Sequence, residues 1–277
     1  MCAATQADDV VMLSLIKDGL NELLNICYTY ADKWRYRYNA SKCAVLVQSK
    51  NIRQSRDIQL RYGNMQIDTV KEYKHLGITQ CNNRRTPASA DVVRQKARGA
   101  LFGLTECGIH SNGLNHITVV KLFTIIVLPR AFFACELWNT ITVCDMRHLK
   151  TTHHFCLKRI LNLPRSTRSD MVKGMLDFTS MQTYKDMHKR LFLGSLCRLQ
   201  PEDTCFKVFI HRLCQHRNAT TRLSKGFMTD IVFSLHKYRL FHYLEEFTTT
   251  SIFPCKPVWK YVCKDSVFKY EQYNLYM

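Results

Sequence analysis

Glycine and proline are scarce in this chain of 277 residues. It contains 10 glycines and 6 prolines, whereas all-β sandwiches and barrels need many turn residues between their short strands. This scarcity argues against an all-β fold and favours a mainly helical chain. Hydrophobic residues make up 46% and charged residues 22% of the sequence. A wholly disordered chain is therefore excluded, because enough apolar side chains are present to form a core.

Long apolar runs and paired cysteines are also lacking. The most apolar stretch, residues 119–134, is interrupted by Lys121, Pro129 and Arg130, and a membrane-spanning helix needs roughly 20 apolar residues. The first nine residues contain no basic residue, unlike a secretory signal peptide. The 13 cysteines form no C-x-x-C pair and are typical of reduced thiols. We expect no membrane partner and an intracellular protein, in the nucleus or the cytoplasm.

Acidic residues are also few relative to basic residues. The chain has 40 Lys and Arg against 22 Asp and Glu, a net charge of +18. Residues 1–80 hold 11 basic and 8 acidic residues, a net +3, and residues 81–277 hold 29 and 14, a net +15. Such an excess predicts a polyanionic partner, and nucleic acid fits it better than a membrane surface. The partner should bind the second segment.

The hydrophobic pattern predicts an α+β fold of two parts, with a boundary in the polar segment 82–87. In the first part we expect a small antiparallel β/α domain over residues 1–80, with a helix capped by Asp18. Apolar runs indicate strands there, and Gly63 with Asn64 indicates a hairpin turn. The predicted strands cover residues 10–13, residues 44–47 and a segment around Tyr73, Leu76 and Ile78.

The second part, residues 81–277, is predicted to be mainly α-helical. Its apolar residues recur at helical spacing, beginning with Val92, Val93, Ala97 and Leu101. The aromatic end from Ile252 onward has no clear periodicity and is left unassigned. Further helices are expected near residues 115–128, 130–140, 145–161, 180–200, 203–216 and 228–247.

The adjacent carboxylates Asp8 and Asp9 precede the apolar run of residues 10–13. Carboxylates at the end of a turn supply oxygen ligands for a hard divalent cation such as Mg²⁺. Phosphoryl-transfer enzymes use such ligands to hold two metal ions about 3.5–4 Å apart. Because neighbouring strand residues point to opposite faces, a second carboxylate must come from another strand. The alternative interpretation is a solvated turn near a terminus.

The segment of residues 6–14 resembles the aromatic-Ala-Asp-Asp strand-turn-strand of reverse transcriptases from non-LTR (LINE-type) retrotransposons. Residues 39–43 are similar to the family's Asn-Pro-Ser-Lys segment, and residues 73–77 to its Tyr-Lys-Tyr-Leu-Gly strand. The order is that of the family, and the resemblance extends from residue 6 to about residue 200. Motifs similar to those of the family's thumb and downstream helices follow at residues 96–101, 128–130, 135–138 and 159–167.

The resemblance implies a polymerase palm over residues 1–80 and a helical thumb with a C-terminal extension over residues 81–277. It implies Mg²⁺ and a deoxynucleotide as cofactor and substrate, and an RNA template, a DNA primer or an RNA–DNA hybrid as partners. Asp8 would be the metal ligand with Asp9 beside it, and Lys42 would approach the phosphates of the incoming nucleotide. The primer end would be gripped by the strand containing Tyr73, Leu76 and Gly77.

Other interpretations remain open at this point. Lys42 also suits a solvated loop, and Tyr73 and Leu76 also suit a core. A non-catalytic, basic, helical nucleic-acid-binding protein is the alternative function, and a protein scaffold is a third. Gln6 stands where the family has an aromatic residue, and Ala40 where it has proline. The family's other metal-binding aspartate would precede Met1, so we expect this chain to be a C-terminal part of such an enzyme and inactive alone.

Basic side chains cluster within residues 147–168. Asp145 is the only acidic residue that we count near this cluster. The basic residues Lys185, Lys189, Arg190 and Arg198 follow it in the sequence. With few compensating acids, the stretch favours phosphate contacts over a merely solvated helix face. The residues expected to contact nucleic acid are Lys158, Arg159, Arg165 and Arg168, with Arg147 and Lys150 nearby.

A second group of metal-ligand residue types occurs at Cys205, His211, Cys214 and His216. Their spacing, C-x5-H-x2-C-x-H, does not match a zinc knuckle. At helical spacing, the apolar residues of the same stretch explain it as a helix that faces a core.

We expect the purified chain not to extend a primer on RNA or DNA in the presence of Mg²⁺. Two metal ions need carboxylates from two strands, and the sequence offers only the Asp8–Asp9 pair in such a setting. Incorporation of labelled deoxynucleotides on a primed template measures this. Template-dependent incorporation that Asp8→Ala abolishes would contradict the expectation.

Overall fold

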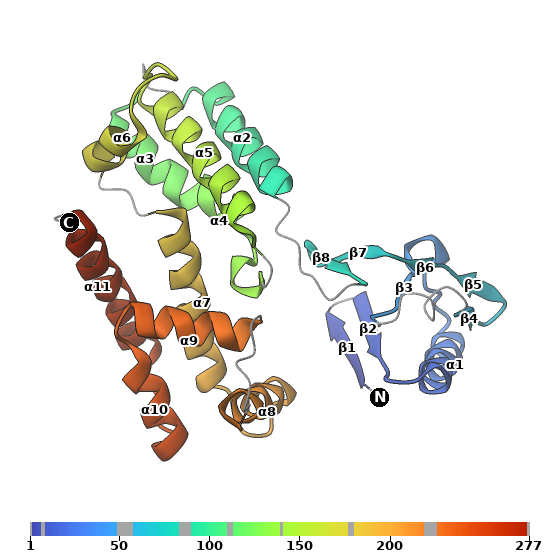
Figure 1. Cartoon of the computed structure of the whole chain (residues 1–277). Coiled ribbons are helices and arrows are strands. Elements are labelled where there is room, and N and C mark those ends of the chain that lie inside the picture. The colour runs from blue at the N-terminus through green and yellow to red at the C-terminus, as the bar shows by residue number, and fades with distance from the viewer. Residues whose placement is uncertain are drawn as a thin grey trace. The chain divides into compact units, whose positions relative to one another are not determined.

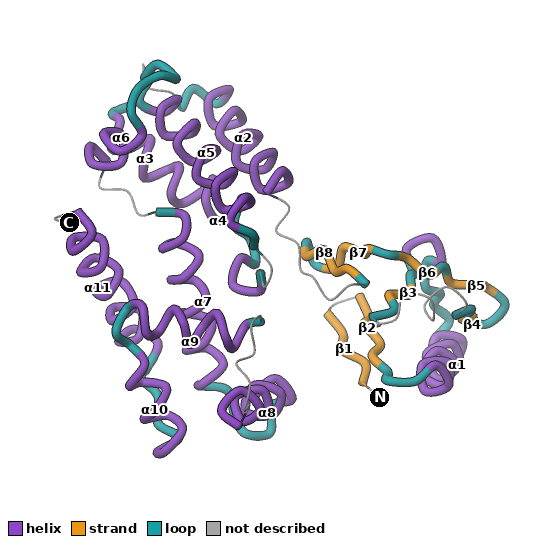
Figure 2. Tube along the Cα trace, in the orientation of Figure 1, coloured by secondary structure: helices purple, strands orange, loops and turns teal. Residues whose placement is uncertain are grey.

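The computed structural model describes residues 2–6, 9–48, 58–82, 90–109, 113–138, 141–176, 180–218 and 226–275. The chain divides into two compact units, Met1–Thr86 and Pro87–Met277. The described strands all lie in the first unit, and the second unit is built of helices (Figures 1 and 2). The predicted α+β class is confirmed. None of the described helices combines the length and apolarity that crossing a membrane requires.

The first unit begins with a hairpin and a helix. Strand β1 (Cys2–Gln6) pairs antiparallel with β2 (Asp9–Leu13), and Gln6 lies opposite Asp9. Helix α1 (Lys17–Lys33) follows, and its N-cap is Ile16, which has the extended backbone that precedes a first turn. The predicted cap at Asp18 is therefore wrong. Asp18 lies inside the first turn, where a carboxylate still interacts favourably with the helix dipole.

Three small sheets complete this unit. Strand β3 (Val45–Leu46) pairs in parallel with β6 (Thr69–Val70), and β4 (Leu60–Tyr62) pairs antiparallel with β5 (Met65–Ile67). The turn between β4 and β5 is the predicted one at Gly63 and Asn64, with Gly63 at φ 55°. The buried residues that join α1 to these strands are Leu24, Ala31, Val45, Leu60, Tyr62 and Ile67.

The segment predicted as one strand around Tyr73 and Ile78 is instead a hairpin. Strand β7 (Glu72–His75) pairs antiparallel with β8 (Ile78–Cys81). Leu76 and Gly77 form the turn, and both have positive φ, 47° and 80°. Two consecutive left-handed residues reverse a chain within two residues, so a continuous strand cannot pass through them.

The second unit contains most of the predicted helices. The C-terminal aromatic segment, left unassigned from the sequence, forms its longest described helix. The helices are α2 (Ala90–Glu106), α3 (His116–Leu122), α4 (Leu128–Ala131), α5 (Val143–Ile160), α6 (Ser169–Leu176), α7 (Met181–Cys197), α8 (Thr204–Asn218), α9 (Phe227–Lys237), α10 (Phe241–Thr250) and α11 (Lys256–Leu275). A π-helical turn (Phe123–Val127) joins α3 to α4.

Two of the predicted helices are interrupted by single left-handed residues. The helix expected over residues 130–140 ends at Ala131, and Ala134 at φ 57° leads into a 3₁₀ turn, Cys135–Leu137. The helix expected over residues 228–247 is divided into α9 and α10 at Arg239, also at φ 57°. A left-handed residue cannot continue a right-handed helix, and neither residue is a glycine that would signal the break in the sequence.

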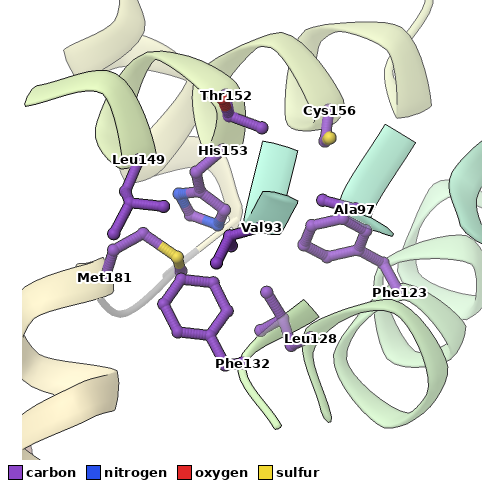
Figure 3. Close-up of a pocket in the computed structure, with 10 residues that line it drawn as sticks. All are labelled: Val93, Ala97, Phe123, Leu128, Phe132, Leu149, Thr152, His153, Cys156 and Met181. Carbon is purple, nitrogen blue, oxygen red and sulfur yellow. The ribbon is translucent and has the colours of Figure 1, made fainter. Parts of the chain in front are cut away.

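Helix α7 belongs to both cores of this unit. Its start, at Met181 and Tyr184, packs into the core of α2 to α5, and its end, at Leu193 and Cys197, packs into the core of α8 to α11. The first core is dense. The side chains around His153 enclose a cavity of only about 10 Å³ (Figure 3), no larger than one water molecule needs, so this space is a packing gap and not a ligand site.

Gly194 of α7 is where the last helix approaches most closely. A Cβ atom built on Gly194 would lie 2.3 Å from Cδ1 of Trp259. Trp259 is fully buried, and its indole N–H donates a 2.8 Å hydrogen bond to the carbonyl oxygen of Arg190. The indole is therefore held against the helix and cannot move aside, so this contact requires glycine.

Gly194→Ala should therefore destabilise the chain. A glycine-to-alanine change in a helix normally stabilises it by about 0.5–1 kcal/mol, but overpacking a core costs about 1–3 kcal/mol. The matched control is Gly99→Ala in α2, where nothing lies within 4 Å of the added Cβ. Denaturant unfolding of the full chain should show opposite signs for the two variants. Equal stabilisation by both would contradict the close approach of Trp259.

Candidate functional site

The structure places Asp9 as the first residue of β2, exposed and directly across the hairpin from Gln6. Asp8 lies outside the described residues. A strand start suits an oxygen ligand for Mg²⁺, but a two-metal site needs more than one carboxylate. The described residues of the first unit contain no cluster of three or more metal-ligand side chains.

Lys42 and Tyr73 are brought together although they are 31 residues apart. Lys42 ends a 3₁₀ turn, Ala40–Lys42, in which Oδ1 of Asn39 accepts hydrogen bonds from the backbone N–H and the hydroxyl of Ser41. The phenol of Tyr73 donates a 2.8 Å hydrogen bond to the carbonyl oxygen of Lys42. This bond ties the turn to β7, and the Lys42 side chain stays exposed.

Leu76 is exposed at the tip of the β7–β8 hairpin. Half of its surface is accessible, and it holds a left-handed conformation that costs an ordinary residue about 1–2 kcal/mol. The interpretation of Leu76 as a core residue is therefore wrong. An apolar side chain held outward on a strained turn, beside Gly77, is an arrangement that functional sites often contain.

In the second unit, Lys158 and Arg165 meet at the end of α5. The Lys158 ammonium donates a 2.9 Å hydrogen bond to the carbonyl oxygen of Arg165, and the Arg165 guanidinium lies 5.8 Å from the centre of the Phe155 ring. Arg159 and Arg165 are exposed. The structure records no carboxylate partner for either arginine among the described residues.

Arg168 differs from these neighbours because it has a carboxylate partner. Its guanidinium donates to both carboxylate oxygens of Asp170, at 2.6 and 3.3 Å. This hydrogen bonding lowers the pKa of Asp170 and raises the pKa of Arg168. The prediction that Asp145 is the one acid near this basic cluster is therefore wrong, because Asp170 pairs with Arg168. Arg168 is therefore the one of the four predicted phosphate contacts that has a carboxylate partner among the described residues.

The basic residues that follow on α7 are not free to contact phosphate. Lys189 is 1% exposed, and its ammonium donates to the carbonyl oxygen of Trp138 and to the carboxylate of Asp230. Arg190 is fully buried, donates to Ser266 at 2.8 Å, and lies 3.8 Å from the Tyr238 ring centre. The expectation that these two cations extend the basic surface is wrong, because the fold places them in the interior.

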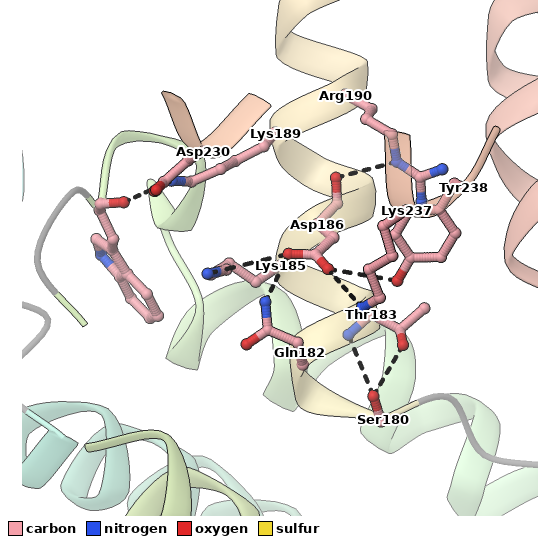
Figure 4. A network of polar contacts seen from close by, with 11 residues as sticks. Ser180, Gln182, Thr183, Lys185, Asp186, Lys189, Arg190, Asp230, Lys237 and Tyr238 are labelled. Carbon is pink, nitrogen blue, oxygen red and sulfur yellow. Dashed lines mark hydrogen bonds and ion pairs between the residues drawn. The ribbon is translucent and has the colours of Figure 1, made fainter. Parts of the chain in front are cut away.

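Asp186 is the anion that faces two other cations of this interior, Lys185 and Lys237 (Figure 4). It is 5% exposed. Its carboxylate accepts hydrogen bonds from Gln182 at 2.7 Å, from Lys237 at 3.0 Å and from Tyr238 at 3.4 Å. These contacts fix α7 to the end of α9. Nothing in the local sequence pattern marked Asp186, because its partners on α9 are about 50 residues away.

The protonation of the neighbouring lysines reflects this environment. Burial lowers the pKa of Lys185, and the ion pair with Asp186, at 3.9 Å, only partly offsets that effect. Burial also disfavours the charged form of Lys237, but attraction to Asp186 and Tyr238 outweighs it and the pKa of Lys237 is raised. Asp186 therefore compensates Lys237 well and Lys185 poorly.

Three metal-ligand residue types also meet in the second unit, at Cys135, Glu136 and His188. Their ligand atoms lie within 4.8 Å of one another, and burial lowers the pKa of His188. Lys185 and Lys189 lie near enough to influence the Cys135 thiol, so the cationic surroundings oppose a divalent cation. The other group of metal-ligand residue types, Cys205, His211, Cys214 and His216, lies on α8. Phe209 and Leu213 of that helix face the core, as predicted.

Two curated proteins are similar to this chain. One is the RNA-directed DNA polymerase from mobile element jockey of Drosophila funebris, 23% identical over 199 residues, which are 68% of this chain and 22% of that protein. The other is the protein of the same name from Drosophila melanogaster, 24% identical over 167 residues, 58% of this chain and 18% of that protein. The resemblance to non-LTR reverse transcriptases is thus confirmed as a distant, family-level similarity.

The matched region is a small part of those proteins. The chain spans about a fifth of the length of the curated relatives that it matches. No protein-family model matches the chain. No solved structure matches it significantly.

Asp186→Asn should lower the stability of the chain by about 3–5 kcal/mol, because it leaves buried cations without their anion. Asp170→Asn is the matched control, since it removes the carboxylate of an exposed pair with Arg168, and exposed pairs contribute little. Urea unfolding followed by circular dichroism measures both variants. An unfolding midpoint for Asp186→Asn equal to that of the control would show that the Asp186 carboxylate does not stabilise the chain through these contacts.

Proposed function

We propose that this chain carries the palm end and the thumb of an RNA-directed DNA polymerase of the non-LTR retrotransposon type. The observation that carries the proposal is the ordered series of motifs, beginning at Asp8 and Asp9, together with the distant similarity to two polymerases from mobile elements. In the complete enzyme these residues would act with Mg²⁺ and a deoxynucleotide on a primed RNA template.

The first unit supports the palm assignment through its geometry. The hairpin of β1 and β2 holds Asp9 at a strand start, and the hydrogen bond from Tyr73 to Lys42 ties the proposed nucleotide-binding turn to the proposed primer grip. The exposed tip, Leu76 and Gly77, would contact the primer end. Each group is held by backbone structure, which is what positioning a primer terminus next to a nucleotide requires.

The second unit supports a role in gripping the nucleic-acid backbone. Lys158, Arg159 and Arg165 are together near the end of α5, and the two arginines are exposed without a described carboxylate partner. Such contacts go to phosphates, so they position the duplex without reading its sequence. The same surface would serve a non-catalytic nucleic-acid-binding protein, which is the second candidate function that this observation favours.

We expect the chain to bind an RNA–DNA hybrid through the surface that contains Lys158, Arg159 and Arg165. The affinity should depend on salt and show little sequence preference. Each neutralised phosphate contributes a slope of about −0.9 in log affinity against log salt on B-form duplex. If roughly five contacts form, a fourfold rise in salt weakens binding about 500-fold. Fluorescence anisotropy over a salt series measures the slope, and a slope near zero would refute binding through phosphates.

Replacing Arg159 and Arg165 together with alanine should flatten this slope by up to about two units, one for each contact. The matched control is Lys207→Ala with Lys264→Ala, two exposed cations on α8 and α11. These replacements remove the same net charge elsewhere in the same unit. If both double variants flatten the slope equally, the chain binds through its overall charge and not through the end of α5.

A further inference from the structure

A surface cavity lies between the N-terminal parts of α5 and α7. It has a volume of about 420 Å³. Three apolar side chains contribute to its wall, and its polar lining consists of Thr142, Arg147, Lys150, Gln182 and Lys185. Val143, Arg147 and Lys150 are exposed, so this is an open pocket at the surface, unlike the packing gap near His153.

The charge of this lining is of one sign. Arg147, Lys150 and Lys185 are cations, and no carboxylate lines the cavity. The nearest carboxylate on α5, Asp145, is engaged in capping, since it accepts hydrogen bonds from the backbone N–H and the hydroxyl of Thr142. The nearest on α7 is Asp186, which faces Gln182, Lys237 and Tyr238.

Of the three cations that line the cavity, Lys185 is the most buried. Its side chain is 11% exposed, and its ammonium lies 3.9 Å from Asp186, too far for a hydrogen bond. The part of the chain that the structure describes offers this ammonium no closer acceptor. The ammonium is not fully enclosed, so an anion in the cavity could reach it and compensate its charge. Figure 4 shows Lys185 and Gln182 beside Asp186 on the same helix.

We propose that this cavity binds a phosphate group, held by Lys185, Lys150 and Arg147 with the Gln182 amide as a further donor. A phosphate group fits this lining because its anionic oxygens point in different directions and can reach separate cations, and free phosphate or pyrophosphate also carries more negative charge than a carboxylate. The guanidinium of Arg147 can donate two parallel hydrogen bonds to it, and the two ammonium groups act as point charges.

Two sources share this chemistry, namely a phosphate of a nucleic-acid backbone and a free phosphate or pyrophosphate. The first source rests on the proposed function, because it assumes that the second unit binds nucleic acid. The second does not. The cavity would add contacts to those at the end of α5, since Lys150 and Lys158 both belong to α5 and lie eight residues apart along it.

The test compares two probes, pyrophosphate alone and an RNA–DNA hybrid, on the full chain. The variants are Lys185→Gln and Lys150→Gln, with Lys207→Gln as the control because Lys207 is exposed on α8 and does not line the cavity. Lys150 is exposed, so its variant folds even if Lys185→Gln perturbs the helix contacts. Calorimetry measures pyrophosphate binding, and anisotropy measures hybrid binding.

We expect Lys185→Gln to weaken the binding of at least one probe tenfold or more and Lys150→Gln to weaken the same probe threefold or more, whereas Lys207→Gln leaves it within twofold. An effect on the hybrid assigns the backbone as a source, and an effect on pyrophosphate alone assigns free phosphate. If neither probe responds to either cavity variant, the proposal is overturned. A hybrid that does not bind at all refutes the proposed function, while pyrophosphate binding that depends on Lys150 still supports the cavity.

Discussion

The helical unit depends on one buried carboxylate. Asp186 and Asp230 are the acids that face Lys185, Lys189, Arg190 and Lys237, so cations outnumber anions in this interior. Charges are stable away from water only when they are paired and hydrogen-bonded. Asp186 joins α7 to α9, and Arg190 reaches α11 through Ser266. These contacts join α7, which belongs to both cores, to α9 and α11.

The same constraint decides which basic residues remain for function. Buried cations such as Lys189 and Arg190 hold helices together and do not contribute to the positive charge of the molecular surface. Exposed cations such as Arg159 and Arg165 keep their full charge for a partner, while Arg168 shares its charge with Asp170. The net charge of the segment therefore overstates the positive charge that remains at the surface for the proposed nucleic-acid partner. Lys185 is intermediate, because it is mostly buried but poorly compensated.

In the first unit, function would be positioned by turns rather than by side-chain networks. The β7–β8 hairpin reverses at Leu76 and Gly77, and the strain at Leu76 is held by pairing on both sides of the turn. Tyr73 extends from the same strand to the Lys42 turn. A shift of this hairpin would therefore move the proposed primer grip and the proposed nucleotide-binding turn together, which is useful where two substrates must be aligned.

The α+β class, the hairpin at Gly63, most helices and the likeness to reverse transcriptases could be predicted from the sequence, because these depend on local periodicity, turn residues and motif order. The remaining features depend on contacts between segments that are distant in the sequence. The breaks at Ala134 and Arg239 carry no glycine signal, and the hydrogen bond between Tyr73 and Lys42 joins distant segments. Burial separated the cations into structural and exposed ones, since a lysine facing Asp186 and one facing solvent look identical in a sequence.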